Sequence, residues 1–557
     1  MSELPAPMQD RFGAATHRVK NQPAPLEDYN PYLADPVLQT AVKREGAGWA
    51  EEEICSFAEW TGRAETIELG FQANAQKPRL RTHDRYGHRV DVVDFHPSYH
   101  ALMKASIEQG LHSRPWREPG PGAQVARAAK YYLQAQVEAA HGCPITMTFA
   151  AVPALQHEPA LARYWQAKAT AEHYDPRNCP DGEKQGVTLG MAMTEKQGGS
   201  DVRQNTTRAY FIGHDGHGKA YELVGHKWFV SAPMCDAFLV LAQLDAGLTC
   251  FLVPRWRPDA SKNALQIQQL KDKMGNVANA SSEAELRGAL GWRVGEPGRG
   301  VRTIIEMVGM TRYDCMIGSA AGMRQATAQA VHHASQRKAF GATLSEQPLM
   351  QNLLADLALE SEAAATYMMR MARAMDNQHD EHERLLSRIA TPVGKYWICK
   401  RTPSHAYEAM EVIGGTGVIE THIMARLFRE SPVNAIWEGS GNVQCLDILR
   451  AIGREPAVLE AYFAELNRAS GSEPAFDRFV GQLKAQFADR ETLEYRARQV
   501  ADSMALALQA ALLIQHAPSA VADAFVASRL QPQPGMNYGC LPSGLDCGAI
   551  IQRARPQ

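Results

Sequence analysis

The spacing of apolar residues divides the chain into helical and strand-forming stretches. In the first third, apolar positions recur at helical spacing, and helices are expected over 57–69, 99–109 and 123–140. Near residue 188 the pattern changes to short alternating or continuous apolar runs, which predict strands. After residue 295 the helical spacing returns. This order predicts an α+β chain with segregated helices and sheet rather than an alternating βαβ fold.

The strand-forming region has the features of a compact antiparallel β module. A turn at Gly225-His226 is expected to separate two of its strands, and Asp245-Ala246-Gly247 is typical of a hairpin. The expected strands cover 188–193, 207–211, 220–224, 227–231, 238–244, 248–254, 265–270 and 284–290.

The second half of the chain predicts a helical bundle and a helical appendix. Pro392 and Pro403 fall inside one expected helix and are expected to kink it. Together with the stretch from Met410 to Arg450, the long helices form a bundle of about four. The long helices are expected over 301–340, 347–375 and 381–409, and those of the appendix over 455–468, 473–488 and 490–516.

Composition narrows the class of protein. The formal net charge is −3 and 45% of the residues are apolar, so the chain as a whole has no attraction for nucleic acid or anionic membranes. The ten cysteines include no CxxC pair, which argues against a zinc site and a disulfide framework. The first 25 residues contain no apolar core of a secretory signal, and we expect a cytoplasmic protein without a membrane span.

The turn at 436–441 is the first candidate for chemistry. It reads Ile-Trp-Glu-Gly-Ser-Gly and opens a helix. A carboxylate on a glycine-flanked turn beside a helix N-terminus is held rigidly while its neighbours expose backbone N–H groups. That geometry suits a base facing a cofactor or substrate, and it suits a plain capping turn equally well.

Three other clusters leave two interpretations open each. The loop at 193–202 brings glycines and hydroxyls together and is either a ligand loop or a surface loop. On 227–231, alternation puts Phe229 and Ser231 on one face, which suits a flat heterocycle or the rim of a sheet. The 336–341 segment either clamps a phosphate or simply complements a helix dipole.

Taken together and in order, five motifs resemble the acyl-CoA dehydrogenase superfamily. They are T-E-x-x-x-G-S-D at 194–201, K-x-[WF]-x-[ST] at 227–231, R-K-x-F-G at 337–341, the glycine pair at 414–415 and [YW]-E-G-[ST] at 437–440.

Longer stretches resemble one branch of that superfamily, the AidB-type alkylation-response flavoproteins. REGAGW at 44–49, CPITMTFAA at 143–151 and NAIWEGSGN at 434–442 carry this likeness. The implied fold is an N-terminal helical domain, a central antiparallel β domain and a C-terminal four-helix bundle. The expected divisions are an arm (1–45), these three domains (46–190, 191–295 and 296–450) and a C-terminal helical region (451–557).

The resemblance implies an FAD site and a role for each matching residue. Glu438 matches the catalytic base, and Ser200 and Arg312 match the acyl-CoA site. Arg337, Phe340 and the 411–415 segment are implied to reach the FAD of a neighbouring subunit, which implies a homotetramer. The implied FAD-binding residues are Met191, Met193, Thr194, Gly199, Ser200, Phe229, Ser231, Arg337, Phe340, Glu411, Gly414, Gly415, Trp437, Ser440 and Asn442.

The resemblance also implies binding of double-stranded DNA through the C-terminal region. Residues 451–557 hold ten basic and eleven acidic side chains, so binding depends on folding to collect basic residues into a stripe. A solvated helix face is the alternative. The residues expected to contact DNA are Arg450, Arg478, Lys484, Arg496 and Arg529.

The function expected from sequence is that of an FAD flavoprotein in the response to DNA alkylation. It binds duplex DNA and dehydrogenates an acyl thioester with Glu438 as base. The alternative is a conventional short- or branched-chain acyl-CoA dehydrogenase that passes electrons to an electron-transfer flavoprotein and has no role on DNA.

Overall fold

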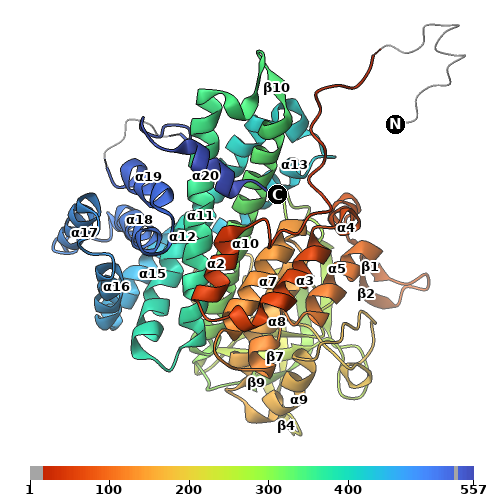
Figure 1. The fold of residues 1–557 in the computed structure, drawn as a ribbon. Coiled ribbons are helices and arrows are strands. Elements are labelled where there is room, and N and C mark those ends of the chain that lie inside the picture. Colours follow the sequence, from red (N-terminus) through yellow and green to blue (C-terminus); the bar gives the residue numbers. More distant parts are fainter. Residues whose placement is uncertain (1–16, 532–536, 557) are drawn as a thin grey trace, which may run out of the picture.

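The computed structural model describes residues 17–531 and 537–556, and it confirms the predicted α+β class. Helices of the N-terminal part cover a central β domain, and long antiparallel helices stand beside both (Figure 1). A further group of helices lies against the outer side of the long ones. One hydrophobic core runs through the helical parts, and a second fills the β domain.

The N-terminal part contains more breaks than its sequence predicts. The expected helix over 57–69 is two helices, because a Cβ at Gly62 would lie 1.7 Å from the Tyr29 carbonyl oxygen. A hairpin of β1 (Arg79–His83) and β2 (Arg89–Asp94) was not predicted. The helices are α2 (Pro36–Arg44), α3 (Glu51–Thr61), α4 (Ala64–Ala75), α5 (Pro97–Glu108), α6 (Arg114–Arg117), α7 (Ala123–Val137), α8 (Gly142–Leu155) and α9 (Pro159–Ala169).

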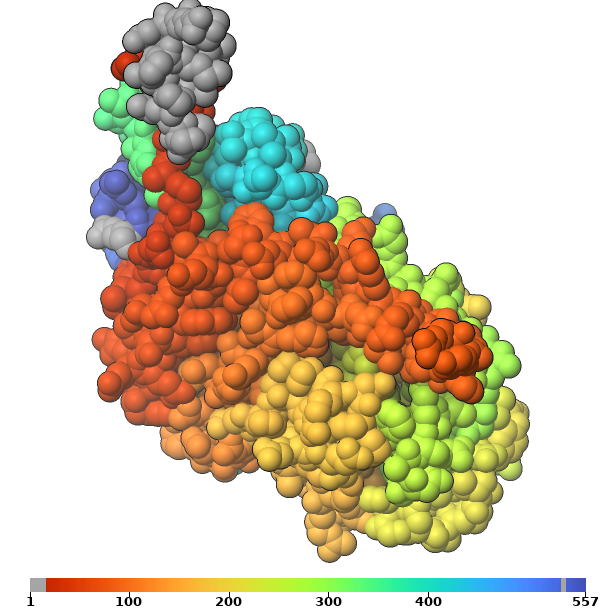
Figure 2. Space-filling model, turned by 90° about the vertical axis from the view of Figure 1, so that its right-hand side faces the viewer, coloured from red at the N-terminus to blue at the C-terminus, as the bar shows by residue number. Residues whose placement is uncertain are grey.

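The described part of the N-terminal arm is packed against the long helices. Tyr32 is fully buried, and the Asp35 carboxylate caps α2 by accepting from two backbone N–H groups. Arg324 donates to the Ala34 carbonyl oxygen over 2.7 Å. Figure 2 shows the arm, in red, continuing upward along the outside of the molecule.

The central β domain is a seven-stranded sheet that curls back on itself. Its strands run in the order β3-β6-β4-β5-β9-β7, β8 pairs with β9, and β7 also pairs with β6. The predicted antiparallel pattern holds except that β3 runs parallel to β6, as does a single pair between β4 and β6. The strands are β3 (Leu189–Ala192), β4 (Arg208–Asp215), β5 (Gly218–Ser231), β6 (Ala237–Leu244), β7 (Gly247–Pro254), β8 (Leu265–Leu270) and β9 (Ser281–Val294).

The predicted turn at Gly225-His226 is wrong, because β5 is one continuous strand. Gly225 is needed for close approach, since a Cβ there would lie 2.4 Å from the Thr207 hydroxyl oxygen. The hairpin predicted at residues 245–247 is confirmed, because β6 pairs with β7 from Leu244 and Gly247 onward.

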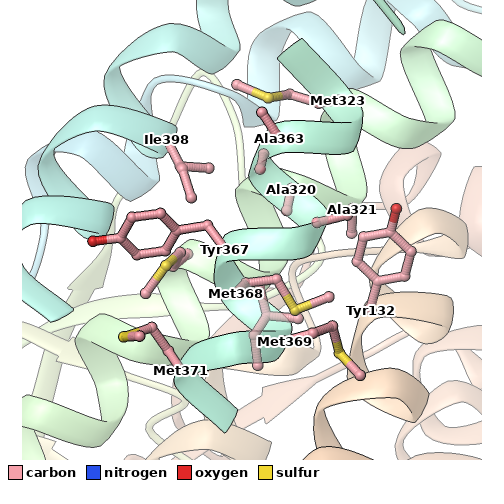
Figure 3. Close-up of a cluster of buried hydrophobic side chains, with 14 of the residues drawn as sticks. Tyr132, Ala320, Ala321, Met323, Ala363, Tyr367, Met368, Met369, Met371 and Ile398 are labelled. Atoms are coloured by element: carbon pink, nitrogen blue, oxygen red, sulfur yellow. The ribbon is translucent and has the colours of Figure 1, made fainter. Parts of the chain in front are cut away.

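Four helices form the C-terminal bundle, as predicted. Pro392 and Pro403 lie within a single continuous helix, α12. Methionine and tyrosine side chains such as Met368 and Tyr367 interlock between the helices (Figure 3), and the Tyr367 hydroxyl donates to the Ala390 carbonyl oxygen over 2.7 Å. The helices are α10 (Gly300–Gln336), α11 (Pro348–Asp376), α12 (Glu381–Ile413) and α15 (Gly441–Arg454).

Short elements connect these helices, and the appendix packs on the outer face of the bundle. α18 contacts α11, α12 and α15, so the appendix shares the core of the helical parts. The connecting elements are β10 (Lys338–Ala339), β11 (Ala342–Thr343), η5 (Gly414–Val418), α13 (Ile423–Glu430) and α14 (Val433–Ile436), and the appendix comprises α16 (Ala457–Asn467), α17 (Pro474–Gln486), α18 (Ala497–His516), α19 (Ser519–Arg529) and α20 (Cys547–Ala554).

Two kinds of feature are absent from residues 17–531 and 537–556. None of their helices combines the length and the apolar character needed to cross a bilayer. No group of three or more His, Cys, Asp or Glu side chains in these residues is arranged to hold a metal ion.

Candidate active site

Glu438 lies on a strained turn that the bundle holds from behind. Its φ of +56° is unusual for a residue other than glycine, and the following Gly439 has a φ of +99°. The buried Lys395 ammonium of α12 donates to the carbonyl oxygens of Trp437 and Gly439 over 2.8 and 2.6 Å. Arg312 of α10 donates to the Glu438 carbonyl oxygen over 2.9 Å. Two cations from two helices therefore fix the backbone of this turn.

The Glu438 carboxylate lies in an environment that suits a base. Burial raises its pKa, although a hydrogen bond from Thr311 and the charges of Lys395 and Arg312 oppose the shift. The Thr311 hydroxyl donates to Oε2 over 3.0 Å, which orients the carboxylate. A desolvated, oriented carboxylate of raised pKa is able to remove a weakly acidic proton from a bound substrate.

A buried ion pair fixes α10, which carries Thr311 and Arg312. Arg127 of α7 donates to both oxygens of Asp314 over 2.8 and 2.6 Å, and these two side chains are almost completely buried. Thr146 of α8 donates to the same carboxylate over 2.5 Å. The N-terminal domain thus sets the position of the helix behind the candidate base.

A second buried ion pair shapes the loop at 193–202. Lys227 of β5 donates to Glu195 over 2.8 Å, and both side chains are almost completely buried. The Trp228 N–H donates to the Thr194 carbonyl oxygen over 2.8 Å. A Cβ at Gly199 would lie 2.6 Å from the Thr194 hydroxyl oxygen. The two motifs are therefore held against each other, and Met191, Met193, Thr194, Gly199 and Ser200 follow one another along β3 and the loop after it.

The end of β5 presents an aromatic ring and a hydroxyl group beside this loop. The pairing register shifts between Lys227 and Val230, so a bulge interrupts the predicted alternation. Phe229 remains 44% exposed. Trp228 instead lies under the Lys271 ammonium, which is 3.0 Å from the centre of its ring. The bulge therefore interrupts the simple alternation from which Phe229 and Ser231 were expected to share a face.

Cys143 connects the end of β5 with the candidate base. This buried thiol of α8 lies beside the Ser231 hydroxyl and the Asn279 amide, and it senses the charge of Glu438. Burial raises its pKa to about 12, so it stays a neutral thiol. The three elements that carry Cys143, Ser231 and Glu438 therefore meet around one site.

The remaining predicted cofactor residues lie apart from this cluster. Phe340, at the tip of the β10–β11 hairpin, has a φ of +55° and is fully exposed. Glu411, at the end of α12, accepts from the Tyr407 hydroxyl. Gly414 and Gly415 follow it and have open space where a side chain would be. Within one chain the structure does not bring these residues to Ser231.

Some predicted residues are committed to other contacts. Arg312 was expected at the acyl-CoA, but its guanidinium binds the Glu438 carbonyl oxygen and, over 2.7 Å, the Asp447 carboxylate. It therefore supports the base from behind. The Asn442 side-chain oxygen accepts from Arg498, Trp437 donates to Asn434, and Ser440 is exposed at the start of α15.

The residues present fit a flat aromatic cofactor with phosphate groups. Phe229 offers a ring face, and Ser231 a hydroxyl group, at the end of β5. The Asn279 amide is 1% exposed and makes no hydrogen bond of standard geometry within the described chain. Gly198, Gly414 and Gly415 leave room for backbone to approach phosphates closely. These features match what FAD requires.

No local sequence pattern indicated several residues of the site. Thr311, Lys395 and Cys143 lie on buried helices among apolar residues, so in the sequence they look like ordinary core positions. Glu195 and Lys227 were inside quoted motifs, yet nothing along the chain indicated that they pair. Only Asn279, next to a loop rich in Asn and Ser, carried a compositional hint.

The basic residues expected at DNA differ in exposure. Arg529 is drawn into ion pairs with Asp356 and Glu360 and is 14% exposed, and Arg496 pairs with Asp489. Arg450, Arg478 and Lys484 remain exposed on α15 and α17. Among the described residues, Arg478 and Lys484 form no ion pair, whereas Arg450 pairs with Asp447 over 3.4 Å.

Comparisons with known proteins agree with this geometry. Family models match as the adaptive response protein AidB N-terminal domain over 21–176 and as the middle and C-terminal domains of acyl-CoA dehydrogenase over 190–289 and 298–453. The chain is 46% identical over 523 residues to the acyl-CoA dehydrogenase-type protein AidB of Escherichia coli (strain K12), covering 94% of this chain and 96% of that one.

Two solved structures share the fold. Caenorhabditis elegans ACDH-11, crystallised in complex with C11-CoA, superposes with a TM-score of 0.83 at 26% identity and covers 98% of this chain and 95% of that chain. An acyl-CoA dehydrogenase complexed with FAD from Bacillus anthracis shares the fold with a TM-score of 0.60 at 18% identity, covering 82% and 79%. The chain belongs to the acyl-CoA dehydrogenase family, within its AidB branch, and its cofactor is FAD.

Proposed function

We propose that the chain dehydrogenates an acyl thioester between its α and β carbons, with Glu438 as the base. The observation that carries this proposal is the oriented, desolvated Glu438 carboxylate, whose charge acts on Cys143 beside Ser231. FAD supplies the hydride acceptor when it is bound. Glu438 would take the α-proton, the electrons of the broken Cα–H bond would form the carbon–carbon double bond, and the hydride lost from the β carbon would need the acceptor that bound FAD supplies.

Residues around the site support this sequence of events. Lys395 and Arg312 keep the turn in place while the carboxylate changes charge, because they bind backbone oxygens and not the carboxylate itself. Cys143 and Met147 are buried near the start of α8, and both belong to the apolar core shared with the β domain. The substrate class is an acyl-CoA-like thioester.

Anaerobic titration of the FAD-loaded protein with short, branched and medium-chain acyl-CoAs tests the proposal. We expect flavin absorbance to bleach with at least one chain length. Glu438→Gln should slow bleaching by about 10²–10⁴-fold, since a general base contributes that much, while FAD content stays unchanged. Equal bleaching rates in wild type and Glu438→Gln would remove Glu438 from its role.

We propose further that the cofactor site is completed in a homotetramer. Phe340 is fully exposed, and Val418 at the end of η5 and the following Ile419 are 64% and 52% exposed. Apolar side chains gathered at this edge favour burial against a partner chain. In this arrangement Arg337, Phe340 and the 411–415 segment contact the FAD of a neighbouring subunit. Sedimentation of the loaded protein should give a tetramer, and a monomer with full FAD content would contradict the proposal.

We propose finally that the protein is cytoplasmic, acts in the response to DNA alkylation and binds duplex DNA. The support is membership of the AidB branch and the exposure of Arg478 and Lys484 on α17 and of Arg450 on α15. The net charge of this region is slightly negative, so binding depends on such local basic surface.

A salt series of electrophoretic shifts with duplex DNA tests this role. Arg478→Ala/Lys484→Ala should weaken binding and lower the slope of log K against log salt by about two, because each phosphate contact contributes about 0.9. Lys104→Ala, an exposed lysine of α5 paired with Glu108, serves as the control and should change nothing. No binding at all would favour the conventional dehydrogenase without a DNA role, and binding that resists salt would exclude Arg478 and Lys484 as phosphate contacts.

A further inference from the structure

A chain of hydrogen bonds leads from a partly buried lysine to the hydroxyl at the end of β5. The Lys273 ammonium donates to the Ser281 hydroxyl oxygen over 2.8 Å and to the Asn279 carbonyl oxygen over 2.7 Å. The Ser281 and Ser231 hydroxyl oxygens are 3.3 Å apart. Lys273 lies in the loop between β8 and β9, so the chain crosses from that loop to the cofactor-facing end of β5.

The charge of Lys273 fixes the direction of this chain. An ammonium only donates, so the Ser281 oxygen must accept from it. The single Ser281 proton is then available to the Ser231 oxygen. The Ser231 proton in turn points away from Ser281 and into the site. A neutral amine at position 273 can instead accept a hydrogen bond from Ser281. The order of donors and acceptors along this chain of hydrogen bonds is then no longer fixed.

The groups around Lys273 leave it charged at neutral pH. Burial lowers its pKa to about 8, and the facing groups are Cys143 of α8, Glu430 of α13 and Glu138 after α7. Burial raises the pKa of Glu430 to about 7, whereas His141 helps to hold that of Glu138 at about 2. Arg426 neighbours both carboxylates. A lysine of ordinary pKa would keep its proton far above neutral pH, but this one loses it within an accessible range.

We propose that Lys273 is a positioning residue that acts through Ser281 to keep the Ser231 hydroxyl donating to the edge of the flavin ring that accepts hydride. A donor at that edge draws electron density from the ring and favours its reduction. This inference rests on the proposed placement of the flavin against Ser231. It assigns a role to a loop residue that contacts neither substrate nor cofactor.

The first test measures the reduction potential of the bound flavin without substrate, by equilibration with a reference dye. Lys273→Met should make two-electron reduction less favourable by about tenfold at pH 7, which is about 30 mV. Lys262→Met is the matched control. Its pKa is also lowered by burial, but its ammonium pairs with Asp91 over 2.8 Å, and we expect no shift. A shift below twofold for Lys273→Met would overturn the proposal.

The pH dependence separates a titrating lysine from a structural one. Lys273 carries its charge below a pKa of about 8 and loses it as the pH rises. The difference in reduction potential between wild type and Lys273→Met should therefore have its full size at pH 7 and be nearly absent at pH 9.5. Lys273→Arg keeps a permanent charge. Its flavin should have the wild-type reduction potential at pH 7 and a higher potential than wild type at pH 9.5. If Lys273→Met does not retain FAD, the comparison of wild type with Lys273→Arg carries the test, and parallel curves would contradict the proposal.

A double-mutant comparison shows whether the effect passes through the two serines. In a Ser231→Ala background, Lys273→Met should change the equilibrium by less than twofold, because the route to the flavin is already broken. The same tenfold shift in that background would show that Lys273 acts only as a distant charge and not through the serines, and it would overturn the proposal. If Ser231→Ala alone leaves the potential unchanged, the flavin is not placed at Ser231, and the proposed site itself fails.

Discussion

The two halves of the candidate site differ in how the chain holds them. Around Glu438, one chain supplies every support: Lys395, Arg312 and Thr311 reach the turn from buried helices. Around Phe340, Asn21 of the arm holds the backbone of the hairpin at Lys338, but the Phe340 ring is fully exposed. The first half is built to keep a carboxylate in a fixed place, and the second is open on the side where a partner chain is proposed.

This difference predicts that chemistry and cofactor retention respond to different substitutions. Changes near the turn should alter proton transfer or stability with FAD still bound. Changes at the hairpin should alter FAD binding and assembly, and leave the turn intact. The predictions below test that separation, beginning with the largest expected effect.

Arg337→Ala should release FAD and loosen the oligomer. Losing a charge-assisted contact to a phosphate costs about 1.5–3 kcal/mol, which corresponds to about 10–100-fold weaker binding. Flavin fluorescence titration measures the affinity, and sedimentation measures the assembly. Lys338→Ala, the adjacent exposed cation, is the control and should retain FAD. Full FAD occupancy in Arg337→Ala would end the proposal of a shared site.

Lys395→Met should lower the free energy of unfolding by about 1–3 kcal/mol. It leaves the Trp437 and Gly439 carbonyl oxygens without their buried donor. Urea unfolding of the FAD-loaded protein measures the change. FAD affinity should stay within a few fold of wild type, because the turn is separate from the hairpin. A large loss of FAD with unchanged stability would contradict the separation of the two halves.

Thr311→Val should shift the pH dependence of flavin bleaching to higher pH. The Thr311 hydrogen bond lowers the pKa of Glu438, so removing it raises that pKa further. Glu438 must be deprotonated to act, and its active fraction grows as the pH rises through its pKa. The rate at neutral pH therefore falls, while the rate at high pH recovers. Stopped-flow bleaching across the pH range measures this, and a rate reduced equally at every pH would exclude the explanation.

Asn21→Ala should weaken FAD binding by only a few fold. The Asn21 side-chain amide pairs with both the N–H and the carbonyl oxygen of Lys338 over 2.8 and 2.7 Å, and Arg337 donates to the Asn21 carbonyl oxygen. The arm thus orders the hairpin without contacting the cofactor, and neutral hydrogen bonds contribute about 0.5–1.5 kcal/mol each. Lys20→Ala, at the exposed residue just before Asn21, is a comparison variant that should have less effect on FAD binding. An affinity equal to wild type in Asn21→Ala would show that the hairpin needs no such support.

The domain order was predictable from sequence because each domain has its own hydrophobic period. Helical spacing, strand runs and glycine-flanked turns are local properties, and the hairpin at 245–247 shows how well a local signal specifies structure. The β1–β2 hairpin carried such a signal too, in the turn that ends at Gly87 with a φ of +87°.

The parts that were missed depend on contacts far apart in the chain. Gly225 is a residue type typical of turns, yet it lies within β5, where the absence of a side chain lets the strand pass close to Thr207. The Glu195–Lys227 and Arg127–Asp314 pairs join residues 32 and 187 positions apart, and no local pattern links them. Arg312 was placed near the right turn, but only its partners show that it supports the base from behind.

Exchange of the α-proton of a thioester that cannot be dehydrogenated tests the central claim most directly. A 3-thiaacyl-CoA in deuterated water isolates proton removal from every later step. The account predicts exchange by the wild-type protein and a loss of about 10²–10⁴-fold in Glu438→Gln. Exchange at the wild-type rate by Glu438→Gln would contradict it.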